Sequence, residues 1–224
     1  MLRSVRHFAA SATPRFFAAS AALRLVAASA ALSLVAPAAQ AHHAMDGKLP
    51  ATLAQGFISG LAHPVVGLDH LAFLVGAGLI AGVLGLGLWV PAVFALASIL
   101  GVAIHLMEIN LPLVELLIGV SVVAVGALLA AARAKLGQGA WIALFAVIGL
   151  VHGYAYGESI VGAEQTPLGA YLVGLALVQS AIGVGVAMLA TRQAWTVGSL
   201  APRLAGAVVL GVGLTAVMGQ ILPG

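Results

Sequence analysis

The sequence predicts an all-α fold, a polytopic membrane helix bundle with about six transmembrane helices. Of the 224 residues, 62% are hydrophobic and only 7% are charged, and the mean hydropathy is +1.17. Soluble domains are closer to half apolar and a quarter charged. Apolar stretches of about 20 residues recur, the length that a helix needs to cross about 30 Å of hydrocarbon. The absence of cysteine excludes disulfides, thiolate metal sites and cysteine nucleophiles.

The first 41 residues have the features of a cleaved secretory signal peptide. Four arginines precede a short apolar run over residues 25–35, and "APAAQA" follows, with Ala39 and Ala41 at the positions of an A-x-A cleavage site. An uncleaved signal anchor is the alternative, which the short apolar run disfavours. The remaining chain has five Lys and Arg against six Asp and Glu, a net charge of −1. The basic pI therefore belongs largely to the leader, and no nucleic-acid partner is expected.

Six spans are predicted in a single domain over residues 42–224. They are expected at roughly 67–88, 90–106, 113–132, 140–156, 168–190 and 204–222. The preceding "LPATLAQGFISGLA" is too short to cross alone, and a re-entrant or interfacial half-helix that ends near His63 is expected there. Small residues, which let helices approach closely in lipid, recur along the spans, as at Gly76, Gly78, Gly82, Gly85, Gly206 and Gly211.

The distribution of charge predicts the orientation in the bilayer. Cleavage by a secretory peptidase would leave the mature N-terminus outside. Six crossings then place Arg133 and Lys135, and the segment from Arg192 to Arg203, on the cytoplasmic side, as the positive-inside rule requires. We therefore expect a multi-pass protein of the bacterial cytoplasmic (inner) membrane, with the histidines and acids of the mature chain near the outer leaflet.

The stretch "HPVVGLDH" brings two imidazoles and a carboxylate to the start of the first span. Ionisable groups inside a membrane are functional candidates because a charge at its centre costs roughly 2.5–3.5 kcal/mol. On one continuous helix, His63 and His70 would lie about two turns apart and face the same way. Asp69 would either ligate a metal or accept an imidazole N–H. The alternative is that His63 and Asp69 only satisfy backbone donors at a helix start.

Further polar groups extend this pattern. In "VHGYAYGE", His152 and Tyr156 share a helix face and Glu158 follows. A histidine packed against a neighbouring helix, with an ordinary loop acid, is the alternative. His42 and His43 would begin the mature chain, where they either capture a divalent cation or form a polar tail. Nitrogen and oxygen donors together suit Ni²⁺, Co²⁺ and Zn²⁺.

These motifs resemble those of a known family. "SGLAHPVVGLDHLAFLVGAGLIAG" is similar to the signature of the HupE/UreJ family of nickel and cobalt permeases, roughly H-P-x-x-G-x-D-H before an apolar helix. "VHGYAYGE" resembles the family's second motif, H-G-x-A-x-G-x-E. The resemblance implies import of Ni²⁺ or Co²⁺ as cargo, without a permanently bound cofactor, for hydrogenase, urease or cobalamin. By position it makes metal-binding candidates of His63, Asp69, His70, His152 and Glu158.

One departure from the family concerns the fifth span. The family commonly has a histidine there, in a stretch similar to Y-x-x-G-F-x-x-x-T-A-x-x-H. In "YLVGLALVQSAIG" this position is Gly183, with Gln179 and Ser180 the nearest polar residues. His105, on the second span with Glu108, is a further metal-binding candidate that would compensate for the missing histidine. The choice between nickel and cobalt stays open.

Two other classes of function stay open beside a secondary permease. A membrane-embedded zinc hydrolase would need an open coordination position and a general base, for which Glu158 or Glu115 are available. No nucleophile or oxyanion constellation accompanies them, and Ser121 is interpreted as an ordinary helix residue. A non-transporting metal receptor or accessory subunit is the other class. No nucleotide-binding loop is present, so transport without ATP hydrolysis, and no enzymatic activity, is expected.

Overall fold

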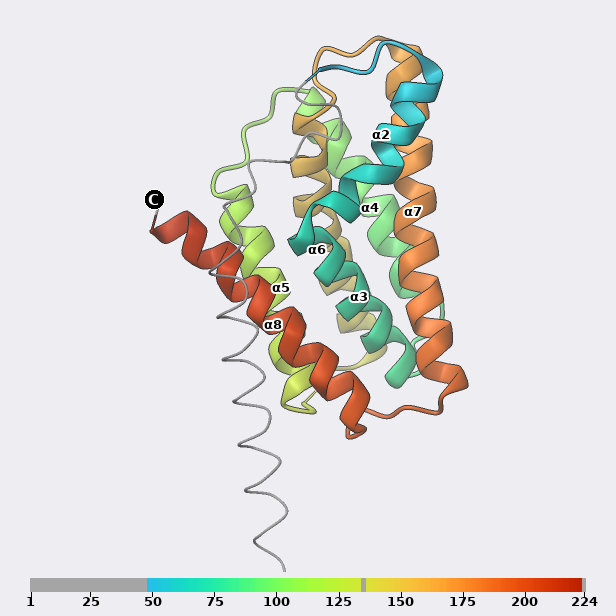
Figure 1. The fold of residues 1–224 in the computed structure, drawn as a ribbon, viewed down its shortest axis with the longest axis vertical. Helices are drawn as coiled ribbons and strands as arrows, with labels where there is room; N and C mark the ends of the chain where they lie inside the picture. The colour runs from blue at the N-terminus through green and yellow to red at the C-terminus, as the bar shows by residue number, and fades with distance from the viewer. Residues whose placement is uncertain (1–47, 134–135, 223–224) are drawn as a thin grey trace, which may run out of the picture.

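The computed structural model describes residues 48–133 and 136–222, which form seven helices and no strand. Figure 1 shows them as one bundle. The helices are α2 (Leu53–Val66), α3 (Leu68–Val83), α4 (Trp89–Leu106), α5 (Val114–Ala130), α6 (Gln138–Glu158), α7 (Gln165–Arg192) and α8 (Leu200–Ile221). The predicted all-helical architecture is confirmed for the described chain. The predicted signal peptide, His42, His43 and Lys135 lie outside the described residues.

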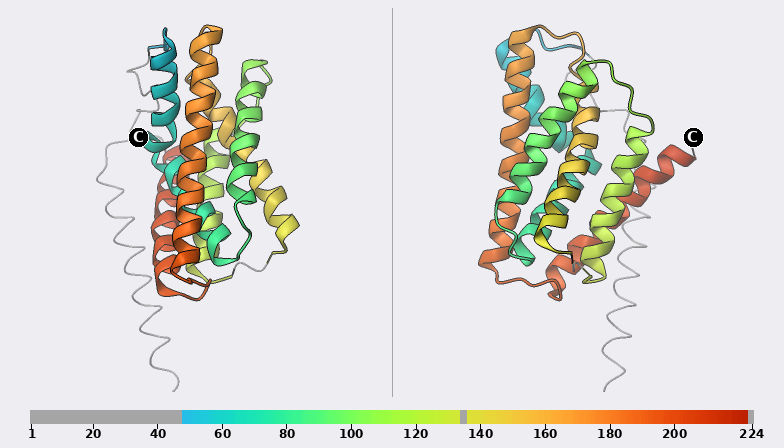
Figure 2. Two further views of the ribbon diagram at one scale, coloured as in Figure 1. Left: turned by 90° about the vertical axis from the view of Figure 1, so that its right-hand side faces the viewer. Right: turned by 180° about the vertical axis from the view of Figure 1, so that it is seen from behind.

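A sharp bend joins the first two helices. Only Gly67 separates α2 from α3, and the two helices are bent by 77°. The long helix α7 packs along both of them, as Figures 1 and 2 show. A short helix is therefore present where the half-helix was expected, as α2, and it packs into the bundle through α7; its re-entrant or interfacial position stays a prediction.

Several helices are long and apolar enough to cross a membrane, and the protein is accordingly a multi-pass membrane protein. Among the described helices, α4, α6, α7 and α8 meet this condition alone. The bent pair α2–α3 meets it jointly, and α5 is an apolar helix of 17 residues. Four helices, or five with the bent pair, are thus capable of spanning, and the full count of six spans stays a prediction.

From α3 onward, successive helices run in alternating directions, so the connecting segments gather at two ends of the bundle (Figure 1). The C-terminal ends of α5 and α7 lie at the same end, which holds Arg133 and Arg192. Arg203 of α8 lies there too, since its Nε donates to the carbonyl of Ala130 at 3.2 Å. At the opposite end lie two acids, Glu158 at the end of α6 and Glu164 directly before α7. The described arginines therefore lie at one end and these acids at the other, while Lys48 precedes α2 at the acidic end.

Glycines allow several helix backbones to approach closely. An added Cβ would overlap a neighbouring helix at four of the positions predicted to do this: Gly76, Gly78, Gly82 and Gly206. Gly126 of α5 is a further case, where a Cβ would lie 2.6 Å from the Cα of Leu210 in α8. Gly85 is different, because it has a φ of +63° in the turn after α3 and nothing within 4 Å. It serves the turn, not a helix contact.

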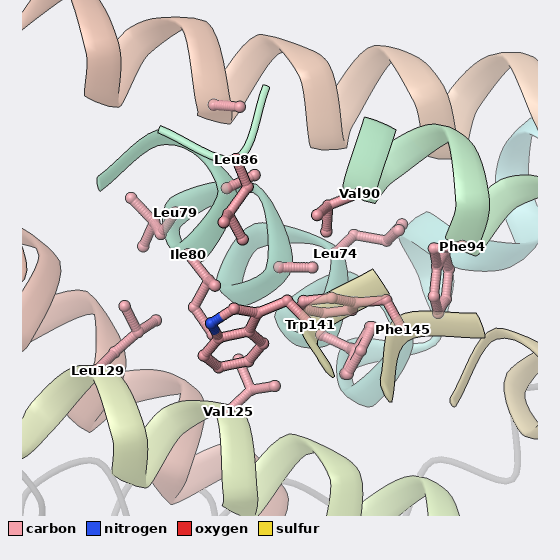
Figure 3. Close-up of a cluster of buried hydrophobic side chains, with 14 of the residues drawn as sticks. Leu74, Leu79, Ile80, Leu86, Val90, Phe94, Val125, Leu129, Trp141 and Phe145 are labelled. Atoms are coloured by element: carbon pink, nitrogen blue, oxygen red, sulfur yellow. The ribbon is translucent and has the colours of Figure 1, made fainter. Parts of the chain in front are cut away.

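The main hydrophobic core lies between α3, α4, α5 and α6 (Figure 3). Its aromatic rings pack in pairs, with centroids 5.7 Å apart for Trp141 and Phe145 and 5.0 Å apart for Phe73 and Phe94. Phe73 and Phe94 also contact His152, at 4.6 and 5.5 Å. The apolar core therefore ends directly against a buried polar group.

The glycine contacts generate a stability prediction. We expect Gly126→Ala to lower the free energy of unfolding by about 1–3 kcal/mol, because α5 and α8 must separate to admit the methyl group. Gly185→Ala is the control, since Gly185 is exposed and an added Cβ there meets nothing within 4 Å. Thermal unfolding of both variants in detergent micelles measures the difference. Equal midpoints for the two variants would contradict the close approach of α5 and α8.

Candidate functional site

Three of the predicted histidines meet in the interior of the bundle. His63 lies on α2, His70 on α3 and His152 on α6, and each is at most 4% exposed. Their rings form a row, with centroids 5.9 Å apart for His63 and His70 and 5.0 Å apart for His70 and His152. The two sequence motifs therefore build one group, called the histidine cluster below.

The bend at Gly67 shapes this cluster. His63 stands in the last turn of α2 and His70 in the first turn of α3, so the two residues do not share one continuous helix. A Cβ at Gly67 would lie 2.7 Å from Cδ2 of His70, so a side chain there would push the ring aside. Asp69 Oδ1 accepts a hydrogen bond from the backbone N–H of His70 at 2.8 Å. Asp69 thus satisfies a backbone donor in the first turn of α3, which is the alternative to its being a metal ligand.

The closest contact of the cluster joins His70 and His152. Their Nδ1 atoms are 2.9 Å apart, and Nε2 of His152 lies 2.9 Å from Oγ of Ser121 on α5. Ser121 donates to the carbonyl of Ile118 at 2.7 Å, so it accepts from His152. A neutral His152 therefore carries its hydrogen on Nε2 and turns the lone pair of Nδ1 toward His70. The alternative interpretation of His152, as a histidine hydrogen-bonded to a neighbouring helix, also holds, because its partner Ser121 lies on α5.

A second hydrogen-bond network holds His63. Its Nδ1 lies 2.9 Å from the hydroxyl of Tyr171 and 3.0 Å from Oγ of Ser159. The Tyr171 hydroxyl donates to the backbone carbonyl of Tyr156 at 2.8 Å, so it accepts from His63. This network ties α2 to α7 and to the C-terminal end of α6. It fixes the ring of His63 and leaves Nε2 as its acceptor nitrogen.

Two of the other candidates line a separate pocket near the loops. The pocket has a volume of about 330 Å³, and its lining includes His105, Glu115, Tyr154 and Glu158. Glu158 is exposed and His105 is half-buried, with its ring 4.4 Å from that of Tyr154. We call this space the acidic pocket. The structure therefore divides the predicted site, because Glu158 lies in the acidic pocket and His152 in the histidine cluster.

The histidine cluster offers few side chains that could ligate a metal ion. Within residues 48–133 and 136–222, no three His, Asp or Glu side chains form a group that could hold a metal ion. The His70–His152 contact supplies two nitrogens that face each other. An ion bound there would need further donors of another kind.

Gly183, at the position where the family commonly has a histidine, lies against the first turn of α4. A Cβ at Gly183 would lie 2.9 Å from Cβ of Pro91, in the first turn of α4. His105 is in the last turn of the same helix, about 20 Å away at 1.5 Å per residue. His105 therefore does not take the place of that histidine. The nearby Gln179 is buried and accepts a hydrogen bond from Ser98 at 2.9 Å.

Three hydrogen-bonding residues of the site were not among the predicted ones: Ser121, Ser159 and Tyr171. The interpretation of Ser121 as an ordinary helix residue is corrected, because it orients His152. One signal was available in the sequence, since Ser121 and Glu115 are the only polar residues of α5. Which helix Ser121 would face depends on packing, which the sequence pattern does not reveal.

Comparison with known proteins points to one family. A family model described as "HupE / UreJ protein" matches residues 30–216. Protein HupE of Rhizobium leguminosarum bv. viciae is 30% identical over 169 residues, which cover 74% of this chain and 86% of that protein. No solved structure matches the chain significantly. Both histidine motifs lie within the matched residues.

The network around His63 generates a second stability prediction. We expect Tyr171→Phe to lower the free energy of unfolding by about 1–3 kcal/mol, because it removes two buried hydrogen bonds of the hydroxyl. Tyr156→Phe is the matched comparison, since the buried Tyr156 hydroxyl has no hydrogen-bond partner within residues 48–133 and 136–222. Denaturation of both variants in detergent, followed by circular dichroism, measures the difference. A larger loss for Tyr156→Phe would contradict this assignment of hydrogen bonds.

Proposed function

The chain belongs to the HupE/UreJ family, and we propose that it is a secondary permease that imports Ni²⁺ or Co²⁺ across the bacterial cytoplasmic membrane. The observation that carries this proposal is the contact between His70 and His152, two buried imidazoles from separate helices. Ionisable groups inside a membrane mark ion pathways more often than packing sites. Imidazole nitrogen is also a good ligand for nickel and cobalt.

The spacing of the two nitrogens suits an ion between them. Two nitrogens that each lie about 2.0–2.1 Å from one metal, at a right angle, are separated by roughly 2.9 Å. The two Nδ1 atoms are already 2.9 Å apart. The hydrogen bond from His152 to Ser121 resembles the outer contacts that orient metal-binding imidazoles in other proteins. In this proposal a small sideways movement of the rings, without separation of α3 and α6, admits the ion.

The proposed route begins at the acidic end of the bundle. His42 and His43 would collect the cation, and the acidic pocket with His105 and Glu158 would concentrate it through its carboxylates. The ion would then exchange its water for nitrogen ligands at the histidine cluster, beside Asp69. On this route Glu158 acts in capture and His152 in the passage of the ion.

The remaining classes of function receive less support from this geometry. A zinc hydrolase needs a general base beside an open coordination position. Glu158 is in the acidic pocket and not in the histidine cluster, so it is not placed as that base. A site with two facing nitrogens binds weakly, and weak binding suits an ion that must be released. The imported metal would supply hydrogenase, urease or cobalamin synthesis.

Uptake by cells tests the proposed function directly. We expect the wild-type chain to raise nickel or cobalt content in a host without its own importers, and His70→Ala to abolish the increase. The reason is that His70 supplies one of the two facing nitrogens. Mass spectrometry of cells supplied with trace Mn, Fe, Co, Ni, Cu and Zn measures the effect at equal protein level. If no metal rises while the wild-type protein is in the membrane, autonomous transport is wrong and the receptor function gains support.

The separation of Glu158 in the acidic pocket from the histidine cluster generates a prediction about uptake kinetics. We expect Glu158→Gln to raise the half-saturating metal concentration several-fold and to keep the maximal uptake rate, because Glu158 lines the acidic pocket and is not part of the histidine cluster. Glu164→Gln is the matched control, an exposed acid at the same end and outside the pocket lining. Initial uptake rates over a range of metal concentrations separate the two constants. A loss of maximal rate at unchanged half-saturation would place Glu158 in the passage step instead.

A further inference from the structure

Tyr156 has a buried hydroxyl that forms no hydrogen bond within the described part of the chain. The residue is 0% exposed, and its hydroxyl has no hydrogen-bond partner among the described residues. A hydroxyl that is removed from water and left unpaired costs stability, and such groups are rare in folded proteins. The hydroxyl is therefore a feature that the fold alone does not explain.

The surroundings of this residue are the histidine cluster. Its ring packs against two imidazoles, with centroids 5.0 Å from His63 and 4.3 Å from His70. The backbone at Tyr156 is also fixed, because its carbonyl accepts a hydrogen bond from Tyr171 at 2.8 Å. The phenol ring is thus held against the two histidines with little freedom to move away.

Packing alone would be served equally well by phenylalanine. Phe73 packs against His152 of the same cluster at a centroid distance of 4.6 Å, without any polar atom. A phenylalanine at position 156 would fill the same space beside the imidazoles and avoid the unpaired hydroxyl. The oxygen of Tyr156 therefore needs another explanation, namely a partner that is present only part of the time.

The cluster itself needs such an oxygen. No three His, Asp or Glu side chains of residues 48–133 and 136–222 form a group that could hold an ion, and His70 with His152 gives only two nitrogens. Ni²⁺ and Co²⁺ accept neutral oxygen donors beside imidazole nitrogen. We propose that the Tyr156 hydroxyl is an oxygen donor to the divalent cation at the histidine cluster, directly or through a water that the ion retains. This inference rests on the proposed function.

The test is a single substitution, Tyr156→Phe, with two measurements on the full chain. The first is thermal unfolding in detergent without metal, where we expect an unchanged or higher midpoint. The second is equilibrium binding of Ni²⁺ and of Co²⁺ to the purified protein, together with cellular uptake. We expect the affinity to fall about 10- to 100-fold, the usual effect of losing a supporting partner of a metal site. Gly185→Ala, which changes an exposed position on α7, is the control for effects of substitution and purification that do not involve the cluster.

The outcomes separate this inference from the proposed function. Weaker ion binding by a variant that is at least as stable as the wild type supports the role of the hydroxyl. Unchanged affinity in Tyr156→Phe, while His70→Ala loses binding, overturns the role of Tyr156 and leaves the permease in place. A lower unfolding midpoint also overturns it, because the hydroxyl would then have a structural partner. Absence of nickel and cobalt binding and uptake in the wild type overturns both.

Discussion

The structure depends on the requirement that imidazoles buried in a membrane protein find hydrogen-bond partners within the protein. Lipid offers none, and an unpaired polar group in an apolar environment costs several kcal/mol. His63 meets this requirement through Tyr171 and Ser159, and His152 through Ser121. These partners lie on α5, α7 and the end of α6, so the polar contacts also determine which helices must meet around the cluster.

The backbone is adapted to the same requirement. The break at Gly67 lets His63 and His70 approach from two helix ends, and a side chain at Gly67 would push the His70 ring aside. Below the cluster the aromatic rings of Phe73 and Phe94 close the apolar core. A polar cluster held on one side by hydrogen bonds and bounded on the other by aromatic rings keeps a defined geometry without water. In the function we propose, such a geometry would suit an ion that has lost part of its hydration shell.

The sequence predicts the class of fold and the gathering of polar residues, because both follow from composition and from the direction of successive helices. It predicts the meeting of His63, His70 and His152 through the motifs that carry them. It does not predict that Glu158, only six residues after His152, lies in a different pocket. Two residues near the end of one helix point to different places according to helix rotation and the neighbouring loop, and neither is encoded in a motif. The role of Ser121 is hidden for the same reason, since it depends on the contact between α5 and α6.

In the proposed permease, the hydrogen bond within the histidine cluster has a consequence for affinity. An arriving ion must replace the contact between His70 and His152, and a hydrogen bond of this kind contributes about 0.5–1.5 kcal/mol. Each 1.4 kcal/mol changes a dissociation constant about tenfold, so this competition weakens binding by up to about that factor. A carrier benefits from such competition, because the ion that it captures at low concentration must also leave. The pairing that stabilises the empty cluster therefore also favours release, and a tightly binding receptor would be expected to hold its histidines apart.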